Sequence, residues 1–200
     1  IYNNISNLVG VFDLEIDQRN LVADRFGVKS FDSLESLLKE VEAVTIAVPT
    51  VFHRDVALKA LEMGTHVIIE KPMSDSVESS KEILQAFAET PFKLAVGHIE
   101  RHNNVVKLAK EKLDSGIWGK LISITARRFS NYPVRISDVG VIFDLSIHDI
   151  DVLNYLVSSD LDTIYCSGNS SKNSAHEDNV NIVLNYSNGV IGVCQTNWLT

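Results

Sequence analysis

Two residues near the middle of the second half have the types and spacing of a general base and its orienting acid. Asp144 and His148 stand four residues apart, so on a helix they share a face. A carboxylate beside an imidazole fixes the ring tautomer and raises its basicity, which suits removal of a proton from an alcohol. Two alternatives remain open. The pair could bind a metal, although no third ligand lies nearby in the sequence, or it could be a capped helix start with a surface histidine.

A second candidate is the segment Glu70-Lys71-Pro72, which follows a short β-branched run at residues 67–69. That run is typical of a strand covered on both faces. Pro72 fixes its own φ and favours an extended backbone at Lys71. The lysine would then stand at the carboxyl end of a parallel strand, where open α/β sheets bind their ligands. The structural alternative is a strand end with a surface ion pair.

Asp13 follows a strand-like segment at residues 8–12 and is a candidate ribose ligand. A carboxylate in that place accepts hydrogen bonds from ribose hydroxyls and repels a 2′-phosphate, which favours NAD over NADP. The alternative is a carboxylate that interacts with a helix dipole. No G-x-G-x-x-G loop lies about 20 residues before Asp13, where a dinucleotide fold places it. Residues 1–200 alone are therefore not expected to bind a dinucleotide normally.

The next predicted strand, residues 43–48, ends in a turn that contains Val48, Pro49 and Thr50, with His53 close behind. A strand, a tight proline turn and a helix N-terminus make a suitable wall for a diphosphate or a ribose. The alternative is a plain connection in which His53 caps its helix.

Several arginines of the second half could bind an anionic substrate through a guanidinium fork. Arg127 and Arg128 are adjacent on a predicted strand, so at most one faces the helix side of the sheet. Arg101 opens a predicted helix and Arg135 lies in a loop. Taken singly, each is more often a solvated surface charge.

The elements that must position these residues fall into two regions. Before residue 97, strands alternate with helices of 10–15 residues, which predicts βαβ units and a parallel sheet. After Gly97 the strands are longer and alternate in polarity, and Asn188-Gly189 is a strong hairpin signal, which predicts an α+β region with a largely antiparallel sheet. The predicted strands of this region span residues 121–129, 163–168, 180–186 and 190–198, and its helices lie at residues 103–114 and in the later part of 140–157.

Composition excludes some classes of partner. The net charge of −8 argues against nucleic acid, because Lys and Arg are not in excess. No apolar run approaches the roughly 18 residues that span a membrane. Cys166 and Cys194 form neither a disulfide framework nor a zinc spacing, which favours a reducing, cytoplasmic setting. The start at Ile1 and the stop directly after an apolar strand-like run suggest that sequence is missing at both ends.

Four motifs run in order along nearly the whole chain: Ala47-Val48-Pro49-Thr50-x-x-His53, Ala60-Leu61-Glu62-x-Gly64-x-His66-Val67-x-x-Glu70-Lys71-Pro72, Val96-Gly97-His98-x-x-Arg101-x-Asn103 and Asp144-x-x-x-His148-Asp149-Ile150-Asp151. Their order and spacing resemble the Gfo/Idh/MocA family, dehydrogenases of sugars, inositols and related polyols. The segments 97–101 and 126–145 look most like the branch that oxidises UDP-N-acetylglucosamine at C3. One departure is that His102 and Asn104 replace the usual Phe and Pro, which alters the expected substrate pocket.

The resemblance implies a doubly wound, Rossmann-like NAD(P)-binding domain at residues 1–98 and an α+β substrate domain with an open sheet at residues 99–200, both incomplete. It implies a homo-oligomer formed through that sheet. It also implies oxidation of a sugar hydroxyl by NAD, with NADP less favoured. His148 would be the base, Asp144 would orient it, and Lys71 would stabilise the charge that develops on the hydroxyl oxygen.

The resemblance also assigns contacts. The cofactor-binding residues would be Asp13, Val48, Pro49, Thr50, His53, Glu70, Lys71 and Pro72, and the substrate-binding residues would be His98, Arg101, Arg128, Arg135 and His148. An arginine would meet the diphosphate of a UDP-sugar. The alternatives are an inositol or other polyol dehydrogenase and a non-catalytic relative that senses a nucleotide or sugar. Because both Lys71 and His148 are present, an enzyme is favoured.

Overall fold

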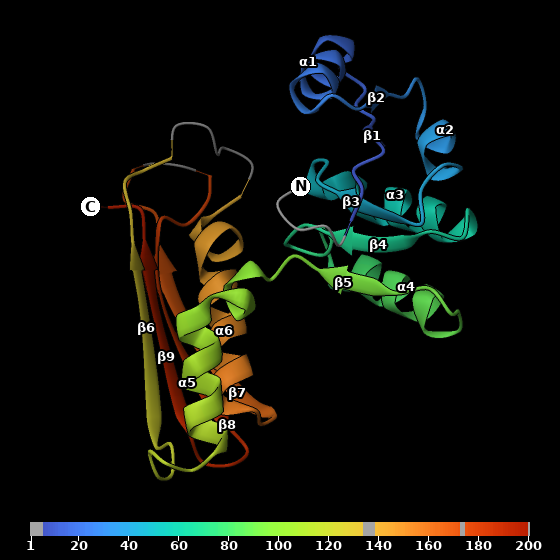
Figure 1. The fold of residues 1–200 in the computed structure, drawn as a ribbon. Helices are drawn as coiled ribbons and strands as arrows, with labels where there is room; N and C mark the ends of the chain where they lie inside the picture. The colour runs from blue at the N-terminus through green and yellow to red at the C-terminus, as the bar shows by residue number, and fades with distance from the viewer. Residues whose placement is uncertain (1–5, 134–138, 173–174, 200) are drawn as a thin grey trace. The chain divides into compact units, whose positions relative to one another are not determined.

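The computed structural model describes residues 6–133, 139–172 and 175–199. The chain divides into two compact units, Ile1–Gly97 and His98–Thr200, which are described separately (Figure 1).

The first unit alternates strands and helices and has only parallel strand pairings among its described residues, as predicted. Its helices are α1 (Ile16–Phe26), α2 (Leu34–Leu38), α3 (His53–Glu62) and α4 (Val77–Ala88), with a 3-10 turn η1 (Thr50–Phe52) before α3. Strands β1 (Gly10–Val11) and β2 (Lys29–Ser30) form one parallel pair. Strands β3 (Ala43–Ile46), β4 (His66–Ile69) and β5 (Leu94–Val96) form a parallel sheet in that order.

The core of the first unit lies on one face of the β3–β4–β5 sheet. Val67 and Ile69 of β4 are buried at 2% and 0% exposure and pack with Ala57 of α3 and Ile83 of α4. Ile68, between them, is 49% exposed. The prediction that this strand is covered on both faces is therefore wrong for the described residues, because α3 and α4 pack against the face that carries the alternate side chains.

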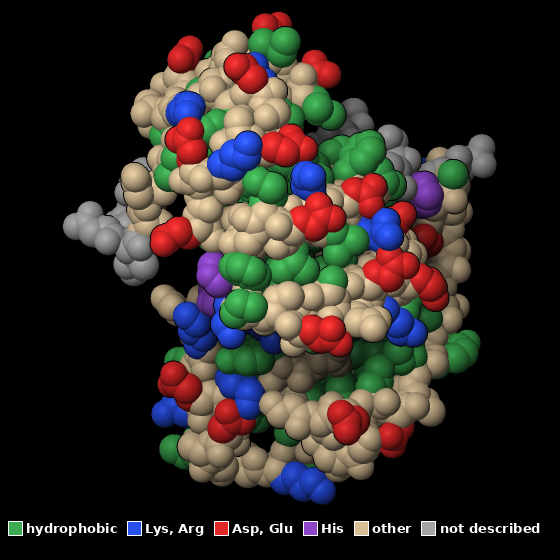
Figure 2. Space-filling view, turned by 90° about the vertical axis from the view of Figure 1, so that its right-hand side faces the viewer, with side chains coloured by type: hydrophobic (Ala, Val, Ile, Leu, Met, Phe, Trp, Pro, Cys, Tyr) green, Lys and Arg blue, Asp and Glu red, His purple; other side chains and the backbone are tan. Residues whose placement is uncertain are grey.

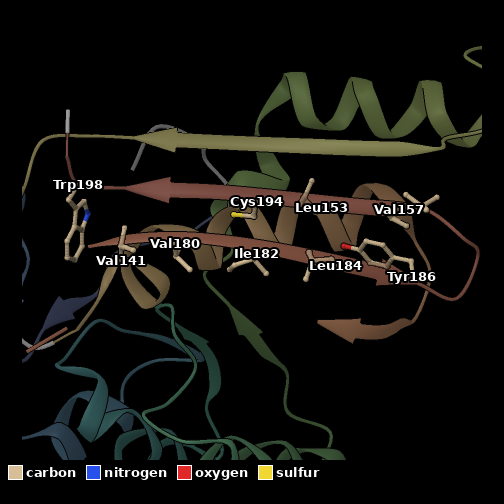
Figure 3. Packing of buried hydrophobic residues seen from close by; sticks show 10 residues of the cluster. Val141, Leu153, Val157, Val180, Ile182, Leu184, Tyr186, Cys194 and Trp198 are labelled. Carbon is tan, nitrogen blue, oxygen red and sulfur yellow. The ribbon is translucent and has the colours of Figure 1, made fainter. Parts of the chain in front are cut away.

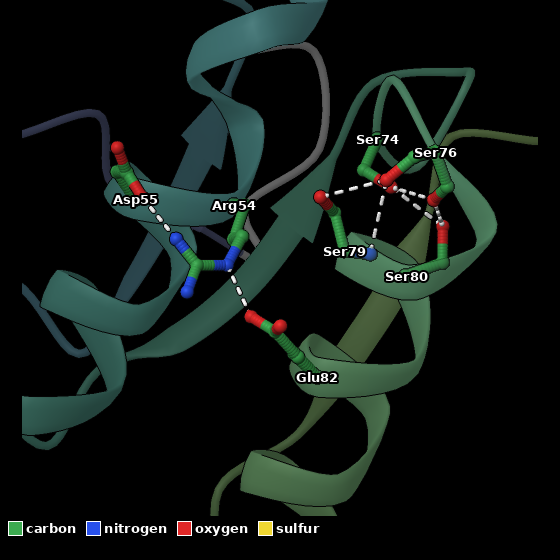
Figure 4. Close-up of polar contacts among 7 residues, drawn as sticks. All are labelled: Arg54, Asp55, Ser74, Ser76, Ser79, Ser80 and Glu82. Carbon is green, nitrogen blue, oxygen red and sulfur yellow. Dashed lines mark hydrogen bonds and ion pairs between the residues drawn. The ribbon is translucent and has the colours of Figure 1, made fainter.

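Side-chain contacts fix the helices that flank the end of β4 (Figure 4). Ser76 caps α4, because its Oγ accepts a hydrogen bond from the Ser79 N–H at 3.1 Å. Arg54 of α3 pairs with Glu82 of α4 and with its neighbour Asp55. Of these contacts, the Arg54–Glu82 pair joins α3 to α4, the helices that precede and follow the Lys71-Pro72 segment in the sequence.

The second unit is a four-stranded mixed sheet with helices on one face (Figure 1). The strands are β6 (Ser123–Phe129), β7 (Leu161–Asn169), β8 (Asn179–Tyr186) and β9 (Ile191–Asn197), in the order β6-β9-β8-β7. The β7–β8 and β8–β9 pairings are antiparallel and the β6–β9 pairing is parallel, which confirms a largely antiparallel sheet. The helical segments are η2 (Ile99–His102, 3-10), α5 (Asn104–Asp114), η3 (Ile142–Ser146, π) and α6 (Ile147–Val157). The predicted hairpin joins β8 to β9, with Gly189 at φ 86°.

The core of the second unit follows from the alternation of its strands (Figure 3). Ile182 and Leu184 of β8 and Cys194 of β9 are buried and pack with Leu153 and other residues of the helical side. The other face of the sheet is open and carries a row of Tyr165, Val183, Val193 and Thr125 at matching register positions. Tyr165 in this row is 69% exposed.

On the face of the molecule shown in Figure 2, basic side chains are interspersed with acidic ones rather than gathered into a basic patch. Within the described ranges, no helix is long and apolar enough to cross a membrane.

Candidate active site

The first unit presents Lys71 two residues after the end of β4, at the carboxyl edge of the parallel sheet. Main-chain hydrogen bonds extend the strand pairing to this point: the Glu70 N–H donates to Ile46 O at 2.9 Å, and the Gly97 N–H donates to Ile69 O at 2.7 Å. The backbone that leads into Lys71 is thus held from both neighbouring strands. The Lys71–Pro72 peptide bond is cis.

Glu70 packs its carboxylate against the end of β5. Its Oε2 lies 3.3 Å from the Lys71 N–H nitrogen, which donates to it. A Cβ added to Gly97 would lie 3.3 Å from the same oxygen, so the absence of a side chain at Gly97 gives the carboxylate its room. The Glu70 carboxylate therefore lies between the Lys71 N–H group and Gly97 at the end of β5.

His53 links the ends of β3 and β4 from inside the protein. Its side chain is buried, at 1% exposure, with Nδ1 2.9 Å from Pro72 O and Nε2 2.9 Å from Val48 O. A neutral imidazole ring has one N–H group, so it donates to one of these two carbonyl oxygens. The alternative in which His53 caps its helix is wrong, because both ring nitrogens face carbonyl groups outside α3.

The other predicted cofactor residues lie at strand ends of the same unit. Asp13 follows β1 with an exposed side chain, and its Oδ1 accepts the Glu15 N–H at 2.9 Å. Pro49 and Thr50 lie in the turn between β3 and α3, and Val48 before them is 39% exposed. An exposed carboxylate after a parallel strand is the group that accepts hydrogen bonds from a ribose, so Asp13 fits the ribose of a nicotinamide dinucleotide.

In the second unit, Asp144 and His148 belong to one continuous helical segment that is wound in two ways. Asp144 lies in the π-helical part, η3, and His148 is the second residue of α6. The prediction that both share a face assumed α-helical spacing, whereas the hydrogen bonds of a π-helix span five residues, so for this segment it stays a prediction. Such π-helical turns inside helices are frequent at functional sites.

Two bidentate ion pairs tie α6 to the rest of the unit. Arg128 of β6 donates from Nε to both Asp149 oxygens at 3.1 Å and from its NH2 group to Oδ1 at 2.9 Å. Arg101 of η2 donates to both Asp151 oxygens at 2.8 and 2.6 Å. Asp149 and Asp151 are both buried. The hydrogen bonds to these carboxylates raise the pKa of each arginine, so both remain charged.

Two further groups join these pairs. Glu100 accepts a hydrogen bond from the NH2 group of Arg128 at 3.2 Å, and His98 Nδ1 lies 3.7 Å from Asp151 Oδ1. Two of the predicted substrate residues, His98 and Arg101, therefore lie beside Asp151, and a third, Arg128, contacts both Asp149 and Glu100. The predicted residue Arg135 lies outside the described residues.

Sequence reasoning missed Glu100, Asp149 and Asp151 as the carboxylate partners of the arginines. The paired residues stand 28, 21 and 50 positions apart, so local spacing does not reveal them. The available signal was the pair Asp149 and Asp151 directly after His148, because carboxylates on a helix are candidate partners for arginines. Among the described residues, no group of three or more His, Cys, Asp or Glu side chains is placed to hold a metal ion.

Together, the units have the architecture of a nucleotide-binding oxidoreductase: a parallel α/β unit with a lysine at a strand end, followed by an α+β unit that carries an acid and a histidine on one helix. Comparison with known proteins agrees with this class. The model of the oxidoreductase family with an NAD-binding Rossmann fold matches residues 2–98, and the GFO/IDH/MocA C-terminal domain matches residues 106–200. The chain belongs to the GFO/IDH/MocA family, which confirms the predicted family and the predicted NAD-binding fold.

Similar proteins include dehydrogenases of sugars and polyols. The UDP-N-acetylglucosamine 3-dehydrogenase of Acidithiobacillus ferrooxidans is 35% identical over 80% of this chain and 50% of its own length. The inositol 2-dehydrogenase of Rubrobacter xylanophilus is 29% identical over 82% of this chain and 48% of its own. A solved structure of the first enzyme, GnnA, matches with a TM-score of 0.90 at 29% identity, over 98% of this chain and 63% of that one. The chain thus spans about half the length of these curated relatives.

Proposed function

We propose that the protein carrying this sequence is an NAD-dependent dehydrogenase that oxidises a sugar hydroxyl to a ketone, with a nucleotide sugar such as UDP-N-acetylglucosamine, oxidised at C3, as substrate. The observation that carries the proposal is the place of Lys71 just beyond the carboxyl end of β4, where main-chain bonds of Glu70 and Ile69 join the strand end to Ile46 of β3 and to Gly97 after β5. The substrate is proposed from the similarity to the UDP-N-acetylglucosamine 3-dehydrogenase.

The strand ends of the first unit would hold the cofactor. The Asp13 carboxylate would accept hydrogen bonds from the adenosine ribose and repel a 2′-phosphate, so NAD is proposed over NADP. The remaining cofactor contacts would come from Val48, Pro49, Thr50, Glu70, Lys71 and Pro72, and from the backbone of His53, whose ring is buried. Bound NAD would supply the acceptor for the hydride that leaves the substrate carbon.

The side chains of the chain would handle the proton and the developing charge. His148 would take the hydroxyl proton while the C–H bond breaks with its electron pair, so the carbon becomes a carbonyl without a free alkoxide. The Lys71 ammonium would donate a hydrogen bond to the oxygen and stabilise its partial negative charge. Asp144 would orient the imidazole of His148. These roles are part of the proposal.

A second candidate substrate is a neutral polyol such as an inositol. Arg101 and Arg128, which the sequence predicts as substrate-binding residues, are each held by a buried carboxylate in bidentate geometry. Their charges are therefore already matched within the unit, which weakens their attraction for an anion. This observation favours a substrate without phosphate groups, and an inositol dehydrogenase is among the similar proteins.

A substrate panel tests the proposal. UDP-N-acetylglucosamine, UDP-glucose, myo-inositol and scyllo-inositol would each be incubated with NAD or NADP, with formation of reduced cofactor as the readout. We expect the highest kcat/KM with UDP-N-acetylglucosamine and NAD. A preference for an inositol would support the second candidate. Binding of cofactor and sugar without turnover of any member would contradict both and support a sensing role.

We also propose a homo-oligomer formed through the open face of the second sheet, in the reducing environment of the cytoplasm. The exposed aromatic ring of Tyr165 and its neighbours Val183 and Val193 support this, because apolar rows on an open sheet face are typical of interfaces. Substituting Val183→Glu should lower the mass measured by light scattering. An unchanged mass would contradict this interface.

A further inference from the structure

The first turn of the helical segment that carries Asp144 and His148 is held by one residue from a distant loop. The Glu177 main-chain oxygen accepts the Val141 N–H at 2.9 Å, and its side-chain Oε1 accepts the Ile142 N–H at 3.0 Å. Amide groups at a helix start have no partner within the helix, so Glu177 satisfies two of them. Its carboxylate also lies at the positive end of the helix dipole, where a negative charge is stabilising.

Gly140 makes this contact possible. A Cβ built on Gly140 would lie 2.1 Å from Oε1 of Glu177 and 2.2 Å from its Cδ, closer than non-bonded atoms approach. Any side chain at this position would therefore displace the carboxylate. The Gly140 carbonyl in turn accepts the Asp144 N–H at 3.2 Å, which connects the contact directly to the candidate acid.

The neighbouring residue Asp178 anchors Glu177 to the sheet. Asp178 is fully buried and accepts the N–H groups of Ser171 and Lys172 at 3.0 Å. Its main-chain oxygen accepts the Trp198 N–H at 2.9 Å, just after β9. Glu177 is thus followed directly by a buried residue that is bonded to Ser171, Lys172 and Trp198.

We propose that Glu177 is a positioning residue for His148: by holding the helix start, with the room that Gly140 provides, it fixes the winding of the segment on which Asp144 and His148 lie. As far as catalysis is concerned, this inference rests on the proposed role of His148 as the base. Residues far from the chemistry influence the rate in this way because small displacements of a base are costly.

Three substitutions at Glu177 separate its contributions. Glu177→Gln keeps an oxygen that can accept the Ile142 N–H, and we expect kcat within about threefold of wild type. Glu177→Ala removes the acceptor and should lower kcat by about 10–100-fold, with the affinity for NAD unchanged. Glu177→Asp keeps the carboxylate on a shorter side chain, and its kcat should lie between those of the other two variants. Ser76→Ala, which removes a comparable cap from α4 in the other unit, is the matched control and should leave kcat near wild type.

A readout that needs no turnover separates this inference from the proposed function. The imidazole resonances of His148, followed by NMR across a pH titration, should move in Glu177→Ala and return to wild-type positions in Glu177→Gln. If the wild-type protein oxidises no sugar, the NMR result alone decides. Should Glu177→Ala not fold, the shorter aspartate variant gives the same comparison. Unchanged His148 resonances in the folded alanine or aspartate variant would overturn the proposal.

Discussion

The first unit positions Lys71 with its main chain, whereas the second unit positions His148 with charged side chains. Lys71 follows a strand whose backbone is bonded to both neighbouring strands. His148 lies on α6, whose residues Asp149 and Asp151 are each held by an arginine from another element. The two sites should therefore respond differently to substitution. Loss of a surface charge should leave the strand end before Lys71 in place, whereas loss of one member of a partly buried ion pair should disturb the helix that carries His148.

The largest effects should come from the two candidate catalytic side chains themselves. In the protein carrying this sequence, Lys71→Ala and His148→Ala should each lower kcat by roughly 10²–10⁴-fold, because charge stabilisation and proton removal are both lost. Binding of NAD, measured separately by titration, should survive both changes. Lys81→Ala, an exposed lysine on α4, is the control. Turnover near wild type in either Lys71→Ala or His148→Ala would contradict the proposed mechanism.

Removing one member of an ion pair tests whether charged side chains hold α6 in the second unit. Arg128→Met leaves the buried Asp149 without its bidentate partner and should lower the free energy of unfolding of this unit by about 1.5–3 kcal/mol. Both tryptophans of the sequence, Trp118 and Trp198, lie in this unit, so their fluorescence in denaturant follows it.

The double variant Arg128→Met with Asp149→Asn completes a mutant cycle. Because the two residues are in direct contact, the double variant should be less destabilised than the sum of the single variants. Additive effects would show that the pair does not hold α6 in place. Arg127→Met, on the neighbouring position of β6 and the open face, should change stability by less than about 0.5 kcal/mol.

The corresponding change in the first unit is His53→Ala, which removes the link between the ends of β3 and β4. The carbonyl groups of Val48 and Pro72 would lose the buried ring that they face and at least one hydrogen bond, and we expect a loss of about 1–3 kcal/mol in the free energy of unfolding together with a lower kcat. His66→Ala, at the opposite end of β4, removes one hydrogen bond with the Lys93 N–H and should leave kcat unchanged. Equal kcat in both variants, measured under saturating substrate, would show that His53 does not support Lys71.

The smallest effect concerns acid stability. Burial alone would raise the pKa of Asp178, but hydrogen bonds from Ser171 and Lys172 outweigh it and lower the pKa. A carboxyl group with a lowered folded-state pKa contributes stability above its unfolded pKa of about 3.9, and loses it as the pH falls through the lower, folded value. Asp178→Asn should therefore reduce the stability of the second unit at neutral pH and flatten its loss in acid. An unchanged acid transition by tryptophan fluorescence would contradict this.

The same contrast explains how far the sequence could predict the molecule. The strand end at Lys71, the βαβ order and the β8–β9 hairpin follow from local signals such as β-branched runs, Pro72 and Asn188-Gly189. The exposure of Ile68 could not be predicted from local signals, because a strand's own sequence does not tell which of its faces the rest of the fold covers. The partners of Arg101 and Arg128 depend on contacts between distant elements.

The two remaining surprises in the candidate sites are also non-local. His53 has a sequence position that suits a helix cap, but its ring nitrogens face carbonyls of Val48 and Pro72, five and 19 residues away. Glu177 lies between β7 and β8, and Ile142, whose N–H it accepts, is 35 residues distant. A spacing rule that considers one element at a time finds neither contact.

The most direct test of the central claim is the fate of the hydrogen on the oxidised carbon. UDP-N-acetylglucosamine labelled with deuterium at C3 would be incubated with NAD and the protein carrying this sequence, and the reduced cofactor would be analysed by mass spectrometry. The proposed reaction predicts one deuterium in each reduced cofactor, and almost no product with His148→Ala. Reduced cofactor without deuterium, or no reduction by the wild-type protein, would contradict hydride transfer from C3.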